Sequence, residues 1–386
     1  MTHPLQILFV LIAAFPASIA VAVPASVFQT EKHRISYEVV TQGLSHPWAL
    51  AFLPDGKMLV SERAGRLRLI DSEGKLDPKP IQGLPPIRQQ GQGGLLDLAL
   101  HPKFRENRWL YFSYAESENG VYGSAVARGR LNGHRLDQLE MIFRMARKTD
   151  SRRHFGSRLA FDRQGHLFIT LGDRGDRPRA QDLNDHAGSL IRLHDDGSIP
   201  DDNPFVGRSD AKPEIYSYGH RNIQGAALHP RTHRLWIHEH GPQGGDEINI
   251  PEPGVNHGWP VITYGVNYFI GTKIGEGTHK TGMAQPIYYW TPSIAPSGMA
   301  FYTGDRFENW KDNLFVGSLK FQQLVRLELN GKRVIHEERV LTGELGRIRD
   351  VRQGPDGLLY LLTDEAEGKL VRLLPQPPLE ALPKAK

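Results

Sequence analysis

A two-strand phrase recurs six times along the chain, and this repeat constrains the fold more than any other feature of the sequence. Each copy is an apolar strand with small residues, a short turn carrying Pro, Asp or Gly, and a second apolar strand. Equivalent leucines in the second strands recur about every 60 residues, a spacing that suits propeller repeats with long loops. The copies begin at Pro47, Leu95, Ser157, Asn222, Pro296 and Ile348.

One such hairpin cannot bury both of its faces, because large apolar residues alternate with small or polar ones. Radial stacking of several hairpins buries both faces and leaves only short edges. We therefore predict an all-β fold, a six-bladed β-propeller with four-stranded antiparallel blades. A β-sandwich, or two of them, is the alternative, and the even spread of the six copies favours the propeller.

Composition removes several classes of function. The chain has 386 residues with 40 Gly, 27 Pro and no Cys, which excludes disulfides and thiolate metal sites. The formal net charge is +4, and the basic residues are interspersed with acidic ones. We expect no nucleic-acid partner, since no Lys/Arg run of the kind that follows phosphates is present.

The N-terminus has the pattern of an export signal. An apolar stretch over 5–14 is followed by Ala20-Val21-Ala22, which resembles a cleavage site. We predict a signal peptide over residues 1–22, a propeller over 23–374 and a flexible tail over 375–386. The protein is then periplasmic or secreted, without stable membrane insertion; an uncleaved anchor is the alternative.

Polar residues gather at the ends of the recurring hairpins, and in a propeller equivalent ends meet at one end of the axis. We expect these residues to converge: Gln92, His154, Arg158, His220, Arg221, Asn222, Gln224, Glu239, Lys320, Arg347, Arg349 and Asp364.

Within this set, His154 is a candidate general base, because a neutral imidazole accepts protons near neutral pH. The alternative is a surface or satisfied core histidine. Arg347 and Arg349 alternate along a strand and so share one face. With Lys320 they indicate a polyanionic ligand; salt bridges to Asp350 or nearby acids are the alternative.

The stretch HGPQGGDE resembles an oxygen-rich Ca²⁺ loop with carbonyls and carboxylates as ligands. An ordinary acidic turn is the alternative. Other motifs are lacking: the sequence has no GxGxxG after a strand, no Walker loop, no GxSxG and no HExxH, and Asp173 and Asp176 do not meet the EF-hand spacing. Nicotinamide chemistry, phosphoryl transfer and serine hydrolysis are therefore disfavoured.

Three segments in this order carry a family resemblance: GHRNIQG, then HGPQGGDEIN with GVNHGWP, then GRIRDV followed by LLTDE. Together they resemble the soluble pyrroloquinoline-quinone (PQQ)-dependent sugar dehydrogenases, most closely the aldose sugar dehydrogenase branch. The likeness spans Gly43 to Asp364 and independently implies a six-bladed propeller.

The resemblance implies that aldoses are oxidised to lactones. In such enzymes His154 would take the proton of the anomeric hydroxyl while a hydride passes to the quinone, and Ca²⁺ would polarise the quinone carbonyl. Arg221 and Arg349 are candidates to stabilise the developing charge. Electrons would leave to an external acceptor, a quinone or a cytochrome. The matching cofactor positions are Gln92, His154, Arg221, Asn222, Lys320, Arg347, Arg349 and Asp364, and the matching metal positions are Gly241, Pro242, Asp246 and Glu247.

The sequence differs from soluble glucose dehydrogenase at two positions that bear on the implied residue roles. Soluble glucose dehydrogenase has Asp immediately before the catalytic His, where this chain has Arg153, so the residue that orients the imidazole is open. His257 stands in place of a Tyr beside a second calcium site, to which Asp246 and Glu247 still correspond.

Two other functions stay open at this point: a Ca²⁺-dependent propeller lactonase, and a non-catalytic sugar-binding propeller, since fold does not fix function. A lactonase needs a carboxylate-rich metal centre, and Lys320, Arg347 and Arg349 argue against it. The sequence leaves open a monomer or a homodimer.

Overall fold

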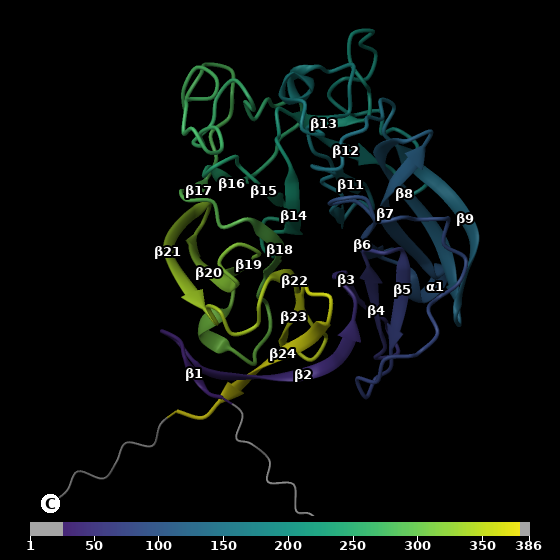
Figure 1. The fold of residues 1–386 in the computed structure, drawn as a ribbon, viewed down its shortest axis with the longest axis vertical. Helices are drawn as coiled ribbons and strands as arrows, with labels where there is room; N and C mark the ends of the chain where they lie inside the picture. Colours follow the sequence, from purple (N-terminus) through teal and green to yellow (C-terminus); the bar gives the residue numbers. More distant parts are fainter. Residues whose placement is uncertain (1–25, 379–386) are drawn as a thin grey trace, which may run out of the picture.

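The protein is a six-bladed β-propeller, as the repeat predicts. The computed structural model describes residues 26–378, whose strands form six antiparallel sheets around a central axis (Figure 1). The six predicted hairpins are the two innermost strands of the six sheets. They are β3 (Pro47–Phe52) with β4 (Met58–Glu62), β6 (Leu95–Leu100) with β7 (Trp109–Glu118), β10 (Leu159–Phe161) with β11 (Leu167–Thr170), β14 (Ile223–Leu228) with β15 (Leu235–Glu239), β18 (Pro296–Phe301) with β19 (Leu314–Ser318), and β22 (Ile348–Gln353) with β23 (Leu359–Thr363).

The outer strands complete the blades, and three short helical turns lie in the loops. The outer strands are β5 (Arg66–Ile70), β8 (Val121–Asn132), β9 (Arg135–Arg144), β12 (Ser189–Leu193), β13 (Ile215–Tyr218), β16 (Asp246–Asn249), β17 (Tyr288–Trp290), β20 (Gln323–Asn330), β21 (Arg333–Val340), β24 (Gly368–Gln376), β2 (Arg34–Leu44) and β1 (Phe28–Gln29). The helical turns are α1 (Phe104–Asn107), η1 (Arg177–Gln181) and η2 (Glu308–Trp310).

The ring is closed by pairing the two ends of the described chain. The last sheet has the order β1-β2-β24-β23-β22, so the purple N-terminal strands lie beside the yellow C-terminal strand in Figure 1. Val39 of β2 is opposite Val371 of β24. Because β2 is followed directly in the chain by β3 of the first blade, this pairing fixes the first and last blades to each other.

Two predicted details need correction. Four of the six sheets have four strands, whereas among the described residues the first has three and the last has five. The tail predicted from residue 375 begins too early, because Pro375 and Gln376 belong to β24 and pair with Ile35 and Arg34. The predicted signal peptide and residues 379–386 lie outside the described residues.

Small residues on the inner strands allow the blades to meet at the axis. The inner strands contact one another in the order β3, β6, β10, β14, β18, β22 and back to β3. A side chain at Gly225 would place its Cβ 2.1 Å from Nε2 of His238, and one at Gly298 would lie 2.4 Å from the amide nitrogen of Val351 in the next blade. Glycine is therefore required at Gly225, which faces the His238 ring on the neighbouring strand of its own blade, and at Gly298, where the backbone of the next blade approaches.

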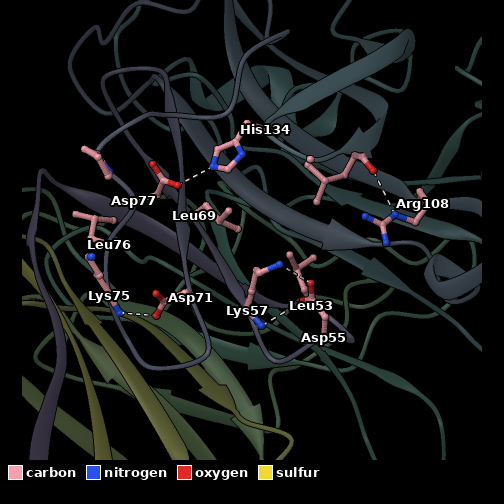
Figure 2. Close-up of a pocket in the computed structure, with 13 residues that line it drawn as sticks. Leu53, Asp55, Lys57, Leu69, Asp71, Lys75, Leu76, Asp77, Arg108 and His134 are labelled. Atoms are coloured by element: carbon pink, nitrogen blue, oxygen red, sulfur yellow. Dashed lines mark hydrogen bonds and ion pairs between the residues drawn. The ribbon is translucent and has the colours of Figure 1, made fainter.

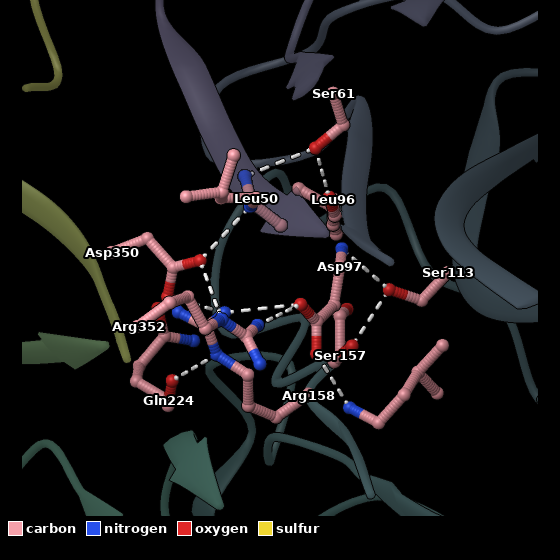
Figure 3. A network of polar contacts seen from close by, with 12 residues as sticks. Leu50, Ser61, Leu96, Asp97, Ser113, Ser157, Arg158, Gln224, Asp350 and Arg352 are labelled. Carbon is pink, nitrogen blue, oxygen red and sulfur yellow. Dashed lines mark hydrogen bonds and ion pairs between the residues drawn. The ribbon is translucent and has the colours of Figure 1, made fainter. Parts of the chain in front are cut away.

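A buried ionic network ties these strands together (Figure 3). Arg158 Nη1 lies 3.0 Å from Oδ1 of both Asp97 and Asp350. Arg352 Nη2 donates to Asp97 at 2.8 Å, and the amide of Leu50 donates to Asp350. Four blades are thus joined. Asp350 pairs with Arg158 and Arg352, so of the salt bridges considered as the alternative for Arg347 and Arg349, those to Asp350 do not form, whereas a nearby acid, Asp364, does pair with Arg349.

The apolar core is divided among the interfaces between neighbouring blades. Leu59, Leu95, Leu110 and Phe112, for example, are fully buried between the first two blades. Each interface removes the large face of one hairpin from water, which is how the six similar hairpins stabilise one another. No helix within residues 26–378 is long and apolar enough to cross a membrane.

Candidate active site

A cavity of 260 Å³ opens where the six blades meet. Its walls come from the start of each inner strand and the end of the strand that follows, so every blade contributes at least one residue. The lining residues are Trp48, Arg63, Gln92, Leu96, Phe155, Gly156, Asn222, Gln224, His240, Ala295, Leu319, Arg347 and Arg349.

Positive charge exceeds negative charge in this cavity. Arg349 Nη2 lies 2.6 Å from Oδ2 of Asp364, while Arg63 and Arg347 each approach the same carboxylate at 3.9 Å. Burial opposes ionisation of Asp364, yet Arg349, Arg63 and the hydrogen bond to His46 hold its pKa well below the ordinary value. One carboxylate cannot neutralise three guanidinium groups, so the cavity attracts an anion with several charges.

The orphaned donors of the cavity fit the same interpretation. Nε of Arg349 is buried and has no hydrogen-bond partner in the described part of the chain. A buried donor without a partner is costly, and an anionic ligand would satisfy it. The polar residues predicted for a cofactor that line the cavity directly are Gln92, Asn222, Arg347 and Arg349, with Asp364 behind them.

Lys320 is placed less directly. It follows Leu319, which lines the cavity, but its own side chain is exposed and its Nζ lies 5.1 Å from the ring centroid of Phe321. The structure therefore does not bring this ammonium group into the lining.

His154 is buried beside the cavity with its imidazole fixed. Its Nδ1 lies 2.6 Å from Oδ1 of Asp173, and the other carboxylate oxygen of Asp173 accepts a hydrogen bond from Trp259 Nε1 at 2.8 Å. The amide of His154 donates to Oε1 of Gln92 at 2.8 Å. Because a carboxylate is only an acceptor, Nδ1 carries the proton and Nε2 is left as the basic atom.

The charge state of His154 suits a base. Burial lowers its pKa below 6.5, and Arg221 and Arg153 act in the same direction against the raising effect of Asp173. The ring is therefore neutral near neutral pH. Asp173 also resolves the departure at Arg153, since it supplies from another loop the carboxylate that orients the imidazole.

Arg221 connects His154 to the predicted metal loop. Its Nη1 donates to the carbonyl oxygens of Gly241 at 2.7 Å and His240 at 3.0 Å, and its guanidinium lies 5.4 Å from the ring centroid of Trp259. Of the two carbonyls predicted to hold a metal, that of Gly241 therefore already accepts a hydrogen bond from Arg221.

Asp246 has a different part in this loop. Its Oδ1 accepts from the Gly241 amide and the Ser293 hydroxyl, and its Oδ2 accepts from the amides of Ile294 and Ala295, at 2.7–3.0 Å. These four contacts use the lone pairs of the carboxylate. The metal role of Asp246 stays a prediction, and its contacts favour bracing the Gly241 backbone.

Glu247 faces a second, very small cavity of 10 Å³ that is also lined by Glu239, His257 and Gly241. Burial and the neighbouring Glu239 raise the pKa of Glu247 to about 8. Among the described residues no group of three or more His, Cys, Asp or Glu side chains could hold a metal. A cation here would therefore depend on backbone carbonyls and on oxygens of a ligand.

A cavity of 440 Å³ on the outer rim, between the first two blades, has a different character (Figure 2). Two of its three carboxylates pair with basic side chains: Lys57 lies 2.9 Å from Asp55, and His134 lies 2.7 Å from Asp77. Such self-neutralised, partly exposed pairs bind no ion strongly. The axial cavity is therefore the stronger candidate for chemistry.

Four residues of the site were missed from the sequence: Trp48, Arg63, Asp173 and Trp259. Trp48 and Arg63 lie at the hairpin ends where polar residues were expected to converge, so the repeat itself could have indicated them. Asp173 and Trp259 lie in long loops, where no periodicity fixes the direction of a side chain.

Comparisons with known proteins identify relatives along almost the whole chain. The model of the glucose/sorbosone dehydrogenase family matches residues 44–372. The aldose sugar dehydrogenase YliI of Escherichia coli is 48 % identical over 348 residues, which are 89 % of this chain and 93 % of the relative. These matches confirm the resemblance inferred from the sequence motifs.

Solved structures agree with the fold. The soluble aldose sugar dehydrogenase of Escherichia coli in its apo-form has a TM-score of 0.86 and 47 % identity, covering 89 % of this chain and all of that one. The PQQ-bound aldose sugar dehydrogenase of Streptomyces coelicolor has a TM-score of 0.72 and 28 % identity, covering 88 % of this chain and 98 % of that one.

Proposed function

Because the chain belongs to the glucose/sorbosone dehydrogenase family, we propose that it oxidises aldose sugars at the anomeric carbon to lactones, with PQQ in the axial cavity and Ca²⁺ beside it at Gly241 and Pro242. The observation that carries this proposal is the meeting of three guanidinium groups around one carboxylate, beside a neutral histidine with a free Nε2. A sugar-binding protein needs neither feature.

The residues of the cavity fit the cofactor. PQQ carries three carboxylates, and Arg63, Arg347 and Arg349 offer a matching number of cations, while Gln92 and Asn222 offer amides for its polar edges. When bound, the quinone supplies a two-electron acceptor and Ca²⁺ a Lewis acid. The backbone carbonyls of Gly241 and Pro242 would hold the cation.

His154 performs the proton transfer in this proposal. Nε2 accepts the proton of the anomeric hydroxyl, and Asp173 stabilises the imidazolium through Nδ1–H. Removal of this proton from the hydroxyl oxygen and of a hydride from the anomeric carbon, for which the quinone would be the two-electron acceptor, converts the hemiacetal into a lactone. Arg221 adds positive charge on the same side of the site, where negative charge develops on the acceptor.

Two further parts of the proposal concern the surroundings of the enzyme. The reduced enzyme passes its electrons to an external quinone or cytochrome. We place the protein in the periplasm or outside the cell, on the strength of the export signal predicted in residues 1–22.

The test is reconstitution. Purified apo-protein is supplied with PQQ, Ca²⁺, a panel of aldoses and an artificial electron acceptor, and dye reduction and lactone are measured. We expect turnover only with the quinone present, and expect His154→Ala to retain quinone binding while losing most of the turnover. Lactone hydrolysis without the quinone would support the lactonase instead, and sugar binding without either reaction would support a binding protein.

A further inference from the structure

Arg174 is a buried arginine whose contacts all lie on the segment that carries His154. It is 1 % exposed and forms no ion pair with a carboxylate of the described residues. Its Nη1 donates to the carbonyl of Arg153 and its Nη2 to the carbonyl of Ser151. Its Cζ lies 3.6 Å from the ring centroid of Phe155. Phe155 in turn lines the axial cavity.

The segment that Arg174 contacts has an unusual backbone. His154, Gly156 and Ser157 have φ angles of 55°, 61° and 89°. Left-handed conformations of residues other than glycine cost on the order of 1–3 kcal/mol each and persist only where surrounding contacts enforce them. The backbone at His154 must therefore be held from outside.

The contacts that hold this segment come from two sides. On the cavity side, Gln92 accepts from the amide of His154 and Asn222 accepts from that of Gly156. On the N-terminal side, the guanidinium of Arg174 donates to two carbonyls of the preceding segment, those of Ser151 and Arg153. A guanidinium fork suits this task, because it donates two hydrogen bonds in fixed directions.

Burying a guanidinium without a carboxylate partner costs free energy. Neutral amide side chains could stabilise a loop at lower cost, so a buried arginine here calls for a more specific role. Arg174 directly follows Asp173, which holds the imidazole of the same histidine. One dipeptide thus fixes His154 at both ends: Asp173 through the ring and Arg174 through the backbone before it.

We propose that Arg174 is a positioning residue that aims the imidazole of His154 by clamping the backbone of residues 151–153. This inference rests on the proposed role of His154 as the base. Arg174 itself touches neither substrate nor cofactor. Its guanidinium acts through the hydrogen bonds that fix the backbone before His154.

The first test uses the cofactor-free protein and needs no activity. The short hydrogen bond between His154 Nδ1 and Asp173 should give a downfield imidazole proton resonance, identified by its loss in His154→Gln. We expect Arg174→Met to weaken or remove this resonance and to speed amide exchange over residues 152–157. Arg174→Lys, which keeps the charge and one donor, should restore part of both.

The second test separates positioning from stability. In the reconstituted enzyme Arg174→Met should lower kcat by about 100-fold, the loss expected from a misplacement of about 1 Å, with the KM for sugar nearly unchanged. Arg179→Lys is the matched control: Arg179 is also buried, but it pairs with Asp185 at 2.7 Å. It should lower the melting temperature without changing the resonance or kcat.

The outcomes are distinct. A folded Arg174→Met that keeps the resonance, the slow exchange and full kcat overturns the proposal; if that variant does not fold, a folded Arg174→Lys that keeps all three, with wild-type melting temperature, overturns it equally. If the wild type shows no quinone-dependent turnover, the proposed function fails, while the resonance and exchange data still decide whether Arg174 positions His154.

Discussion

Nδ1 of His154 and Oδ1 of Asp173 lie 2.6 Å apart across 19 residues of chain. The carboxylate is itself fixed by the indole of Trp259 and the amide of Gly175. This relationship sets both the direction and the tautomer of the imidazole, and it places the basic nitrogen on the far edge of the ring.

The first prediction concerns this pair. In Asp173→Asn an amide NH₂ group would face Nδ1, so the proton would move to Nε2 and the base would lose its free lone pair. We expect kcat to fall by about 100-fold or more, within the range attributed to general-base catalysis, with quinone affinity nearly unchanged. Steady-state kinetics and a quinone titration check this, and wild-type kcat in the variant would contradict the orienting role.

The second prediction is the pH dependence. His154 must be neutral to accept a proton, and burial with Arg221 and Arg153 holds its pKa below 6.5. Activity should therefore be constant near neutral pH and fall as the pH drops through this lowered pKa. Arg153→Gln removes one of the lowering charges, so the acid limb of kcat/KM should move to higher pH.

Arg152→Gln is the control for this measurement. Arg152 is also exposed and neighbours Arg153, but it is not among the principal groups that shift the pKa of His154. Its profile should match the wild type. An acid limb that stays in place in Arg153→Gln, or that lies above pH 6.5 in the wild type, would speak against His154 as the titrating base.

Some residues of the fold and of the cavity were predicted from the sequence. Arg347 and Arg349, predicted from their alternation to share a face, both line the cavity, although Arg347 precedes β22 and the pairing register shifts between Ile348 and Asp350. The small inner residues Gly225 and Gly298 follow from the same repeat. Within a regular strand, periodicity fixes the direction of a side chain once the blade is known, and residues at the ends of the inner strands are brought to the axis by the repeat itself.

Other features depend on contacts that no local pattern encodes. Asp173 contacts His154 only because two separate loops meet in the fold. The carboxylate of Asp246 accepts hydrogen bonds from amides that lie 48 and 49 residues further along the chain. Lys320 was predicted from its neighbours to reach the cavity, yet its ammonium lies over Phe321. Side chains in loops are placed by tertiary packing, which spacing alone does not describe.

The third prediction concerns the charge surplus of the cavity. Asp364→Asn removes the carboxylate shared by Arg63, Arg347 and Arg349. Since breaking a buried ion pair costs about 3–5 kcal/mol, the cofactor-free variant should melt at a lower temperature. Added PQQ should raise its melting temperature by more than that of the wild type. An unchanged melting temperature in the absence of ligand would contradict this electrostatic description.

The fourth prediction concerns the axial network of Figure 3. Asp97→Asn would leave Arg158 and Arg352 short of a partner in the centre of the propeller. We expect the free energy of unfolding to fall by about 3–5 kcal/mol, as for other broken buried pairs.

Urea denaturation measures this loss, and Asp55→Asn is its control. Asp55 pairs with Lys57 on the surface, with side chains 55 % and 45 % exposed, and surface pairs contribute about 1 kcal/mol or less. Equal effects of the two substitutions would show that the axial network contributes no more than a surface pair.

A single-turnover experiment tests the central claim most directly. The apo-protein is loaded with one equivalent of PQQ and with Ca²⁺, mixed with an aldose in the absence of oxygen and of any external acceptor, and the lactone is quantified. We predict one lactone per loaded site in the wild type, and little in His154→Ala at equal quinone occupancy. No lactone from the loaded wild type, or the same yield without the quinone, would contradict it.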